Sequence, residues 1–219
     1  MLLGHYGIAF GAKRAVPRTS LGTLVFAAQF LDELWPVLLL LGVEQVRVVP
    51  GLTRANPLDF VSYPISHSLL MAVVWGALIG GTYGMRRRDR RSGVILGLLV
   101  VSHWLLDLPM HRPDLPLWPG SSVKVGLGAW NSIPLTVVLE LTVFGWGLAS
   151  YLRATRARDR VGTWGLWTMV ALLGLIFASG FGNAAPTSQR VIGLSALGLW
   201  LFVPWAAWVD RHRAVTSGS

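Results

Sequence analysis

Apolar residues fill six long stretches of the chain, and charged residues fall mostly between them. Each stretch approaches the roughly 20 residues that a helix needs to cross a bilayer core of about 30 Å. The predicted spans are residues 21–42, 64–84, 92–111, 128–150, 162–182 and 190–209. A seventh apolar stretch, residues 2–12, is about half as long, so we expect a short re-entrant or interfacial helix there. The pattern predicts an all-α fold, a polytopic transmembrane helical bundle.

The composition agrees with an integral membrane protein. Of the 219 residues, 53% are hydrophobic and 13% are charged, and the mean hydropathy is +0.55. A soluble domain of this size could not cover its apolar surface with so few charges. Soluble enzymes, disordered tails and disulfide-stapled secreted modules are therefore excluded. The chain has no cysteine, which also excludes thiol nucleophiles, iron–sulfur clusters and cysteine zinc sites.

The net charge of +9 is concentrated in alternate connections between the spans. Residues 11–20, 85–91 and 151–160 carry net charges of +3, +4 and +3, whereas the other connections are close to neutral. By the positive-inside rule, we expect the basic connections and both termini to lie in the cytoplasm. The arginine runs lack interleaved aromatic residues and any nucleic-acid motif, so we expect membrane lipids rather than nucleic acid as partners.

Ionisable residues occur inside the predicted spans, where one charge costs roughly 2.5–3.5 kcal/mol near the bilayer centre. Such residues usually face an interior site rather than lipid. They are His5 in the short stretch, Asp32 and Glu33 in the first span, His67 in the second, His103, Asp107 and His111 in the third, and Glu140 in the fourth. No basic residue lies inside the first three spans, so their carboxylates lack a protein cation, which a bound metal or a protonated acid would resolve.

His103 and Asp107 are four residues apart and therefore share one helical face. His111 continues the stripe, although Pro109 distorts the last turn. Imidazole and carboxylate ligands suit Zn, Mn, Fe or Ni rather than Ca or Mg. The stripe predicts a divalent transition-metal site, with zinc as the first choice, and the calculated depths bring Asp32 to the same cavity between mid-bilayer and the outer face.

Simpler roles for these polar residues remain open. Each histidine could simply hydrogen-bond a neighbouring helix, and Glu140 can be neutral and hydrogen-bonded. Glu33 points about 100° away from Asp32 on a helix, so the two carboxylates are not expected to face one ion. A triad of Ser66, His67 and Asp107 is disfavoured, because adjacent serine and histidine side chains rarely face each other.

Two motifs resemble those of the membrane-bound metal-dependent hydrolases, a family that includes the LexA-regulated inner-membrane hydrolase-like proteins of bacteria. The matching stretches are Ser62-Tyr63-Pro64-Ile65-Ser66-His67-Ser68-Leu69 and Ser102-His103-Trp104-Leu105-Leu106-Asp107, with His5, Phe30-Leu31-Asp32 and Trp118-Pro119 at comparable positions. Leu31-Asp32 stands where the family has Pro-Asp, and Ile65-Ser66 replaces a basic residue and threonine. The resemblance covers roughly residues 1–120 and implies a bacterial inner-membrane location, with His5, Asp32, His67, His103 and Asp107 as metal ligands.

The sequence therefore predicts one transmembrane domain, residues 1–219, with a metal-site half at 1–120 and supporting spans at 121–219. The first hypothesis is a metal-dependent hydrolase whose cavity opens to the outer face, with Asp32 or Asp107 as general base and His111 as a further ligand. Arg112 and Lys124 would bind an anionic group of a lipid-like or amphiphilic ester, phosphoester or amide. A transporter using the same residues as an ion or proton pathway is the alternative. A scaffold is the third possibility, in which the buried polar residues only fix helix packing.

Overall fold

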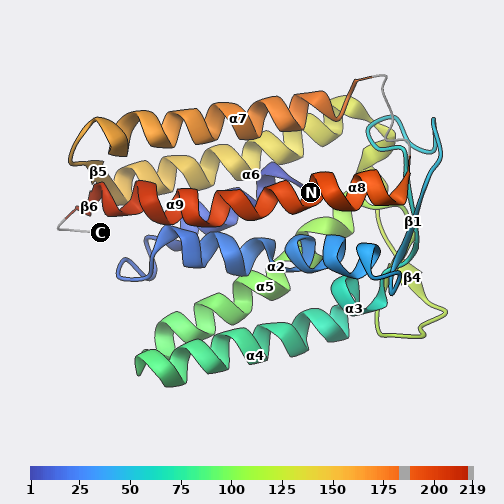
Figure 1. Cartoon of the computed structure of the whole chain (residues 1–219), viewed down its shortest axis with the longest axis horizontal. Coiled ribbons are helices and arrows are strands. Elements are labelled where there is room, and N and C mark those ends of the chain that lie inside the picture. The colour runs from blue at the N-terminus through green and yellow to red at the C-terminus, as the bar shows by residue number, and fades with distance from the viewer. Residues whose placement is uncertain (183–187, 217–219) are drawn as a thin grey trace.

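The computed structural model describes residues 1–182 and 188–216 as a bundle of long helices with very short strands at its two ends (Figure 1). Six helical segments in these residues are long and apolar enough to cross a membrane. They are α2 (Leu21–Leu40), α4 (Leu69–Arg87), α5 (Arg90–Met110), α6 (Ile133–Ala154), the π-helical turn η2 (Val161–Gly165) with α7 (Leu166–Ser179), and the segment of α8 (Gln189–Ala196), η3 (Leu197–Leu201) and α9 (Phe202–Arg211). The predicted all-α polytopic bundle is confirmed.

The second and fourth spans begin later than predicted, and a serine marks each start. A short helix, α3 (Pro64–His67), precedes α4, and the 3₁₀ turn η1 (Ala129–Asn131) precedes α6. Ser68 and Ser132 then adopt extended backbone conformations, and each hydroxyl accepts a hydrogen bond from an amide of the first helical turn. Serine favours this N-cap position. Hydropathy does not detect such breaks, because each is only a few residues long and its polar residues are averaged with the long apolar stretch that follows.

Within residues 1–182 and 188–216, three antiparallel pairs of short strands lie at the ends of the bundle. They are β1 (Gln45–Val48) with β2 (Leu58–Ser62), β3 (Leu115–Pro116) with β4 (Lys124–Val125), and β5 (Thr155–Ala157) with β6 (Arg213–Val215). Figure 1 shows β1 and β4 at one end, which we call the loop end, and β5 and β6 at the other. The second end also carries the arginine-rich connections, and we call it the basic end. Which end faces the cytoplasm stays a prediction.

The half-length helix α1 (Leu3–Ala12) lies inside the bundle and packs against α6 and α2. It approaches α6 so closely that a Cβ atom on Gly147 would lie 1.8 Å from the carbonyl oxygen of Gly7. Most α1 residues are buried, so the predicted interfacial position is wrong and the re-entrant one is closer to the structure. Met1 lies within the bundle rather than at either end, as the N label in Figure 1 shows.

Helices α4 and α5 form a tightly packed hairpin through facing glycines. A Cβ on Gly80 would lie 2.4 Å from the carbonyl oxygen of Gly93, and one on Gly76 would lie 2.7 Å from that of Gly97. Small residues let two helices approach this closely inside a membrane. Because α4 packs mainly on α5, much of its remaining surface is exposed, including the side that faces α2 across a groove.

Candidate metal centre

The six predicted ligand residues come together at one place in the bundle. They are His5 on α1, Asp32 on α2, His67 on α3, His103 and Asp107 on α5, and His111 immediately after α5. The Asp107 carboxylate lies at the centre of this cluster. Its oxygens are 3.2 Å from His5 Nε2, 3.4 Å from His103 Nε2, 3.8 Å from His67 Nε2 and 3.9 Å from His111 Nε2.

Asp32 completes the cluster from the side of α2. Its Oδ1 atom lies 3.4 Å from His67 Nε2 and 3.6 Å from His103 Nε2. Two groups of side chains therefore offer three ligand atoms within 4.8 Å of one another: His5, His103 and Asp107, and Asp32, His67 and His103. Both groups include His103, whose Nε2 atom faces both carboxylates. One nitrogen lone pair can coordinate only one ion at a time. We interpret the two groups as parts of one site.

The spacing of the ligand atoms fits a transition-metal ion. Bonds of about 2.0–2.1 Å to nitrogen and oxygen in a tetrahedral site place neighbouring ligand atoms about 3.3 Å apart. The closest contacts in the cluster, between the carboxylates of Asp32 and Asp107 and the Nε2 atoms of His5, His67 and His103, range from 3.2 to 3.6 Å. His103 Nε2 is also buried without a hydrogen-bond partner in the described part of the chain. The donor set of imidazoles and carboxylates therefore fits zinc or a similar ion.

A peptide carbonyl fixes the tautomer of His103. His103 Nδ1 lies 2.7 Å from the carbonyl oxygen of Ala28 on α2. A carbonyl can only accept, so Nδ1 carries the proton and the lone pair remains on Nε2, which faces Asp32 and Asp107. Metal-binding histidines typically use this arrangement, in which the second ring nitrogen donates to a carbonyl or carboxylate.

A buried glutamate and a serine fix His67 in the same sense. Ser66 Oγ donates to Glu44 Oε2 over 2.6 Å and lies 2.8 Å from His67 Nδ1. Because the only hydroxyl proton goes to Glu44, Ser66 must accept from His67 Nδ1, and the Nε2 lone pair is again free. Glu44 also accepts the backbone amides of Ile65 and Ser66, which anchors α3 beside the cluster.

His111 has a carboxylate partner at the loop end. Its Nδ1 lies 2.9 Å from Asp114 Oδ1, which also accepts a hydrogen bond from the Tyr63 hydroxyl. Burial alone would raise the pKa of Asp114, but the hydrogen bonds from His111, Tyr63 and Arg112 outweigh it and hold this pKa below its usual value. The carboxylate is therefore available to orient His111. Sequence reasoning missed Glu44 and Asp114, because both lie in connections outside the spans.

His5 is held differently from the other three histidines. Its ring stacks on His103 with the centroids 3.6 Å apart and an interplanar angle of 12°. Its Nδ1 atom is buried without a hydrogen-bond partner in the described residues, and its Nε2 faces Asp107. The structure therefore brings His5 to the cluster, beside Asp107.

A comparison with family models assigns the chain to a known membrane family. The model of the YdjM inner membrane protein family matches residues 5–184. The chain belongs to the YdjM inner membrane protein family. Neither the search of curated proteins nor the search of solved structures gave a match.

The match begins at His5 and includes every candidate ligand of this YdjM chain. It continues through α6 and α7, beyond residues 1–120 to which the motif resemblance extends. The expected resemblance is thereby confirmed, and the chain is a multi-pass inner membrane protein. The orientation of its termini stays a prediction.

The two weaker acidic candidates of the YdjM chain lie outside the cluster. Glu140 accepts the backbone amides of Leu2 and Gly4 at 2.7 and 2.8 Å, so it holds the start of α1 in place. The Met1 amine forms an ion pair with Asp107, so the expectation that this carboxylate lacks a protein cation is wrong. Both carboxylate oxygens of Glu33 are buried, belong to neither candidate ligand group and make no hydrogen bond within the described residues.

The two cations predicted to bind substrate are placed differently. Arg112 forms ion pairs with Asp59 and with Asp114, so its charge is already compensated. Lys124 lies exposed on β4. Both lie at the loop end, as His111 does, and their role in substrate binding stays a prediction.

Exposure differs sharply among the residues of the cluster. The side chains of His5, His67, His103, Asp107 and His111 are each at most 4% exposed. The Asp32 side chain is 25% exposed. Asp32 is therefore the ligand-cluster residue that a small molecule can reach most easily. An opening toward the outer face stays a prediction.

Proposed function

We propose that this YdjM family chain is a metal-dependent hydrolase of the inner membrane that holds one divalent transition-metal ion, with zinc the first choice. One observation carries the proposal: His67, His103 and His111 each direct Nε2 toward the Asp107 carboxylate while Nδ1 is held by Ser66, Ala28 or Asp114. A scaffold needs hydrogen bonds between helices, but it does not need three imidazoles oriented in the same sense around two acids.

The residues divide the expected chemistry among themselves. A bound ion would lower the pKa of a coordinated water to near 7 and polarise the scissile group. Asp107 is almost completely buried at the centre of the histidines, which suits a ligand. Asp32 is partly exposed, which suits a general base that accepts a proton on the substrate side.

The surroundings favour an amphiphilic substrate. The cluster lies inside a bundle of apolar helices, where a lipid-like molecule can reach it from the membrane and a strongly hydrated solute must first lose its water. We propose an ester, phosphoester or amide with an apolar chain. An anionic part of that molecule would compete with Asp59 for Arg112 or bind the exposed Lys124.

The first test measures metal in the detergent-purified protein by ICP mass spectrometry. We expect about one Zn, Mn, Fe or Ni per chain in the wild type, and a loss of that metal in His103→Ala and Asp107→Asn. His212→Ala is the matched control, because His212 pairs with Asp159 at the basic end, outside the cluster. Size-exclusion profiles would show whether the variants remain folded.

Activity is tested next on micellar esters, phosphoesters and amides that bear a chromogenic leaving group. We expect hydrolysis that chelators abolish and added metal restores, and Asp32→Asn should lower the rate more than it lowers metal content. A wild type that holds no metal and is not stabilised by any would overturn the proposal. The ion or proton pathway would then be tested by solute flux in proteoliposomes.

A further inference from the structure

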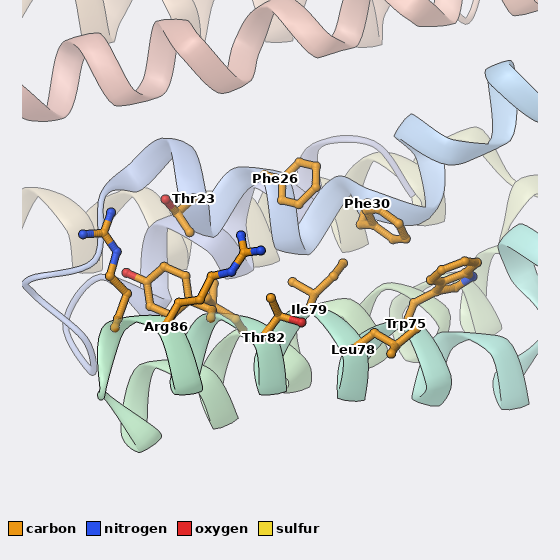
Figure 2. A pocket seen from close by; sticks show the side chains of 11 residues that line it. Thr23, Phe26, Phe30, Trp75, Leu78, Ile79, Thr82 and Arg86 are labelled. Carbon is orange, nitrogen blue, oxygen red and sulfur yellow. The ribbon is translucent and has the colours of Figure 1, made fainter.

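A long apolar groove runs along the surface between α2 and α4, and no residue of the metal cluster lines it. It has a volume of about 770 Å³. Figure 2 shows Phe26 and Phe30 of α2 facing Trp75, Leu78 and Ile79 of α4 across it. The groove exists because the glycine contacts hold α4 against α5, which leaves α2 and α4 apart on this side.

A basic pocket adjoins the groove at the basic end of the bundle. This second hollow has a volume of about 660 Å³ and shares Thr23, Tyr83 and Arg87 with the groove. Its cationic lining consists of Arg18, Arg87, Arg88 and Arg90. In the part of the chain that the structure describes, none of these four arginines has a carboxylate within ion-pair distance.

One acid also lines the basic pocket, but it is already engaged. Asp89 accepts hydrogen bonds from the amide and the hydroxyl of Ser92, at 3.0 and 2.6 Å, and thereby caps α5. Four arginines against one acid leave a net positive charge in the pocket. Charge of this sign at the end of an apolar groove is complementary to a ligand that is anionic at one end and apolar along its length.

The length of the groove identifies the ligand more closely. On α4 the lining runs from Trp75 to Arg87, a distance of about 18 Å along the helix. The hydrocarbon of one leaflet is about 15 Å thick, half of a core of about 30 Å. An acyl chain whose phosphate lies at the arginines would therefore extend along the groove to the Phe30–Trp75 pair, whose ring centroids are 5.6 Å apart.

We infer that this groove is a binding site for an anionic phospholipid, with its phosphate on Arg18 and Arg87 and one acyl chain between α2 and α4. A peptide is a poorer occupant, because the apolar walls offer almost no partners for its backbone amides. A free phosphate would use the basic pocket and leave the apolar groove unfilled. The site does not depend on the metal cluster or on the proposed hydrolase activity.

The test compares lipids on delipidated protein by native mass spectrometry and thermal unfolding. We expect phosphatidylglycerol to remain bound at about one per chain and to raise the unfolding midpoint, and phosphatidylcholine to do neither. Near a membrane surface each arginine contributes about 1 kcal/mol, or about fivefold in affinity. Arg18→Gln/Arg87→Gln should therefore weaken phosphatidylglycerol binding by about 25-fold. Arg156→Gln/Arg158→Gln is the matched control, because it removes two exposed arginines from another connection at the basic end.

A second pair of variants tests the groove itself. Leu78→Trp fills the groove and should abolish the bound lipid, whereas Leu98→Trp, at an equally exposed position on α5 outside the groove, should not. The inference would be overturned if the control arginine variant lost as much phosphatidylglycerol binding as Arg18→Gln/Arg87→Gln. It would also be overturned if phosphatidylcholine bound as well as phosphatidylglycerol, or if inorganic phosphate stabilised the protein as much as phosphatidylglycerol does. The inference would also be overturned if the wild type were a dimer, the Leu78→Trp variant were a monomer, and both bound phosphatidylglycerol equally well.

Discussion

His103 Nδ1 lies 2.7 Å from the carbonyl oxygen of Ala28, one helical turn before Asp32 on the same helix. Helix α2 thus supplies both a carboxylate of the metal cluster and the acceptor that orients a histidine toward that carboxylate. A small shift of α2 relative to α5 would change the position of Asp32 and the hydrogen bond of His103 at the same time. The packing of these two helices is therefore part of the site and not only its support.

The position of His103 predicts one metal ion per chain. Since both candidate ligand groups share His103 Nε2, we expect a stoichiometry of one and a complete loss of metal in His103→Ala. His5→Ala and His67→Ala each remove a candidate ligand from only one group. Each variant should therefore bind the metal less tightly but still bind one ion per chain at saturation. Isothermal titration with zinc measures both quantities. Two ions in the wild type, with one lost in His5→Ala, would contradict the shared site.

The Glu44–Ser66–His67 chain predicts an unusual effect of a conservative substitution. In Glu44→Gln, an amide NH₂ facing Ser66 would donate to it, so that the serine donates to His67 Nδ1 and moves the imidazole proton to Nε2. We expect metal affinity to fall by about 10–100-fold, the usual range for such supporting partners. Competition against a chelator measures this loss.

Ser66→Ala is the informative companion to Glu44→Gln. Ser66→Ala removes the hydroxyl that connects Glu44 to His67, but His67 Nδ1 can still keep its proton. We therefore expect a smaller loss of metal affinity than in Glu44→Gln. Asp159→Asn, a carboxylate-to-amide change at the basic end, should leave affinity unchanged. If the Ser66 and Glu44 variants both bound metal as the wild type does, the proposed orientation of His67 would be wrong.

The sequence identified the residues of the cluster better than the residues that orient them, for a physical reason. Histidines and acids inside apolar spans are conspicuous, because burying them is costly, and helical periodicity places His103 and Asp107 on one face. Glu44 and Asp114 reach the site from connections between spans. No periodicity constrains those segments, and charged residues are common in them, so nothing distinguished these two from ordinary loop acids.

The position of α1 could not be predicted from length and hydropathy alone. An apolar stretch of half-span length fits an interfacial helix as well as a buried one. The close approach of Gly7 and Gly147 allows α1 to lie buried against α6. Two glycines so far apart in the sequence leave no local pattern from which this contact could be predicted. The spans themselves were predictable, because crossing a membrane requires only length and apolar composition.

The crossing of α1 and α6 predicts a sharp difference between two neighbouring glycines. A Cβ at Gly147 would lie 1.8 Å from the Gly7 carbonyl oxygen, whereas one at Gly145 would meet nothing within 4 Å. Gly147→Ala must push α1 away, at a cost of about 1–3 kcal/mol. We expect its unfolding midpoint to fall by several degrees and its metal affinity to fall with it, because α1 carries His5.

Gly145→Ala is the matched control on the same helix. Replacing a helical glycine by alanine where there is room stabilises by roughly 0.5–1 kcal/mol. Its midpoint should therefore equal or exceed that of the wild type, with unchanged metal binding. Thermal unfolding in detergent and zinc titration check both variants. An intact midpoint and intact affinity in Gly147→Ala would show that α1 does not need this close approach.

Asp89 predicts a stability difference that depends on pH. Its hydrogen bonds with the hydroxyl and amide of Ser92 hold the pKa of this carboxyl below its usual value. The folded state therefore favours the ionised form, and its stabilisation is complete above the unfolded pKa of about 3.9. It is lost as the pH falls through the lower folded pKa. Asp89→Asn keeps a capping oxygen without a charge, so the difference in unfolding midpoint between wild type and this variant should shrink toward acid pH. Asp89→Ala lacks the cap, so at neutral pH its unfolding midpoint should lie below those of the wild type and of Asp89→Asn. If the difference in midpoint between wild type and Asp89→Asn stayed constant from pH 7 to pH 3, this role for the carboxylate would be excluded.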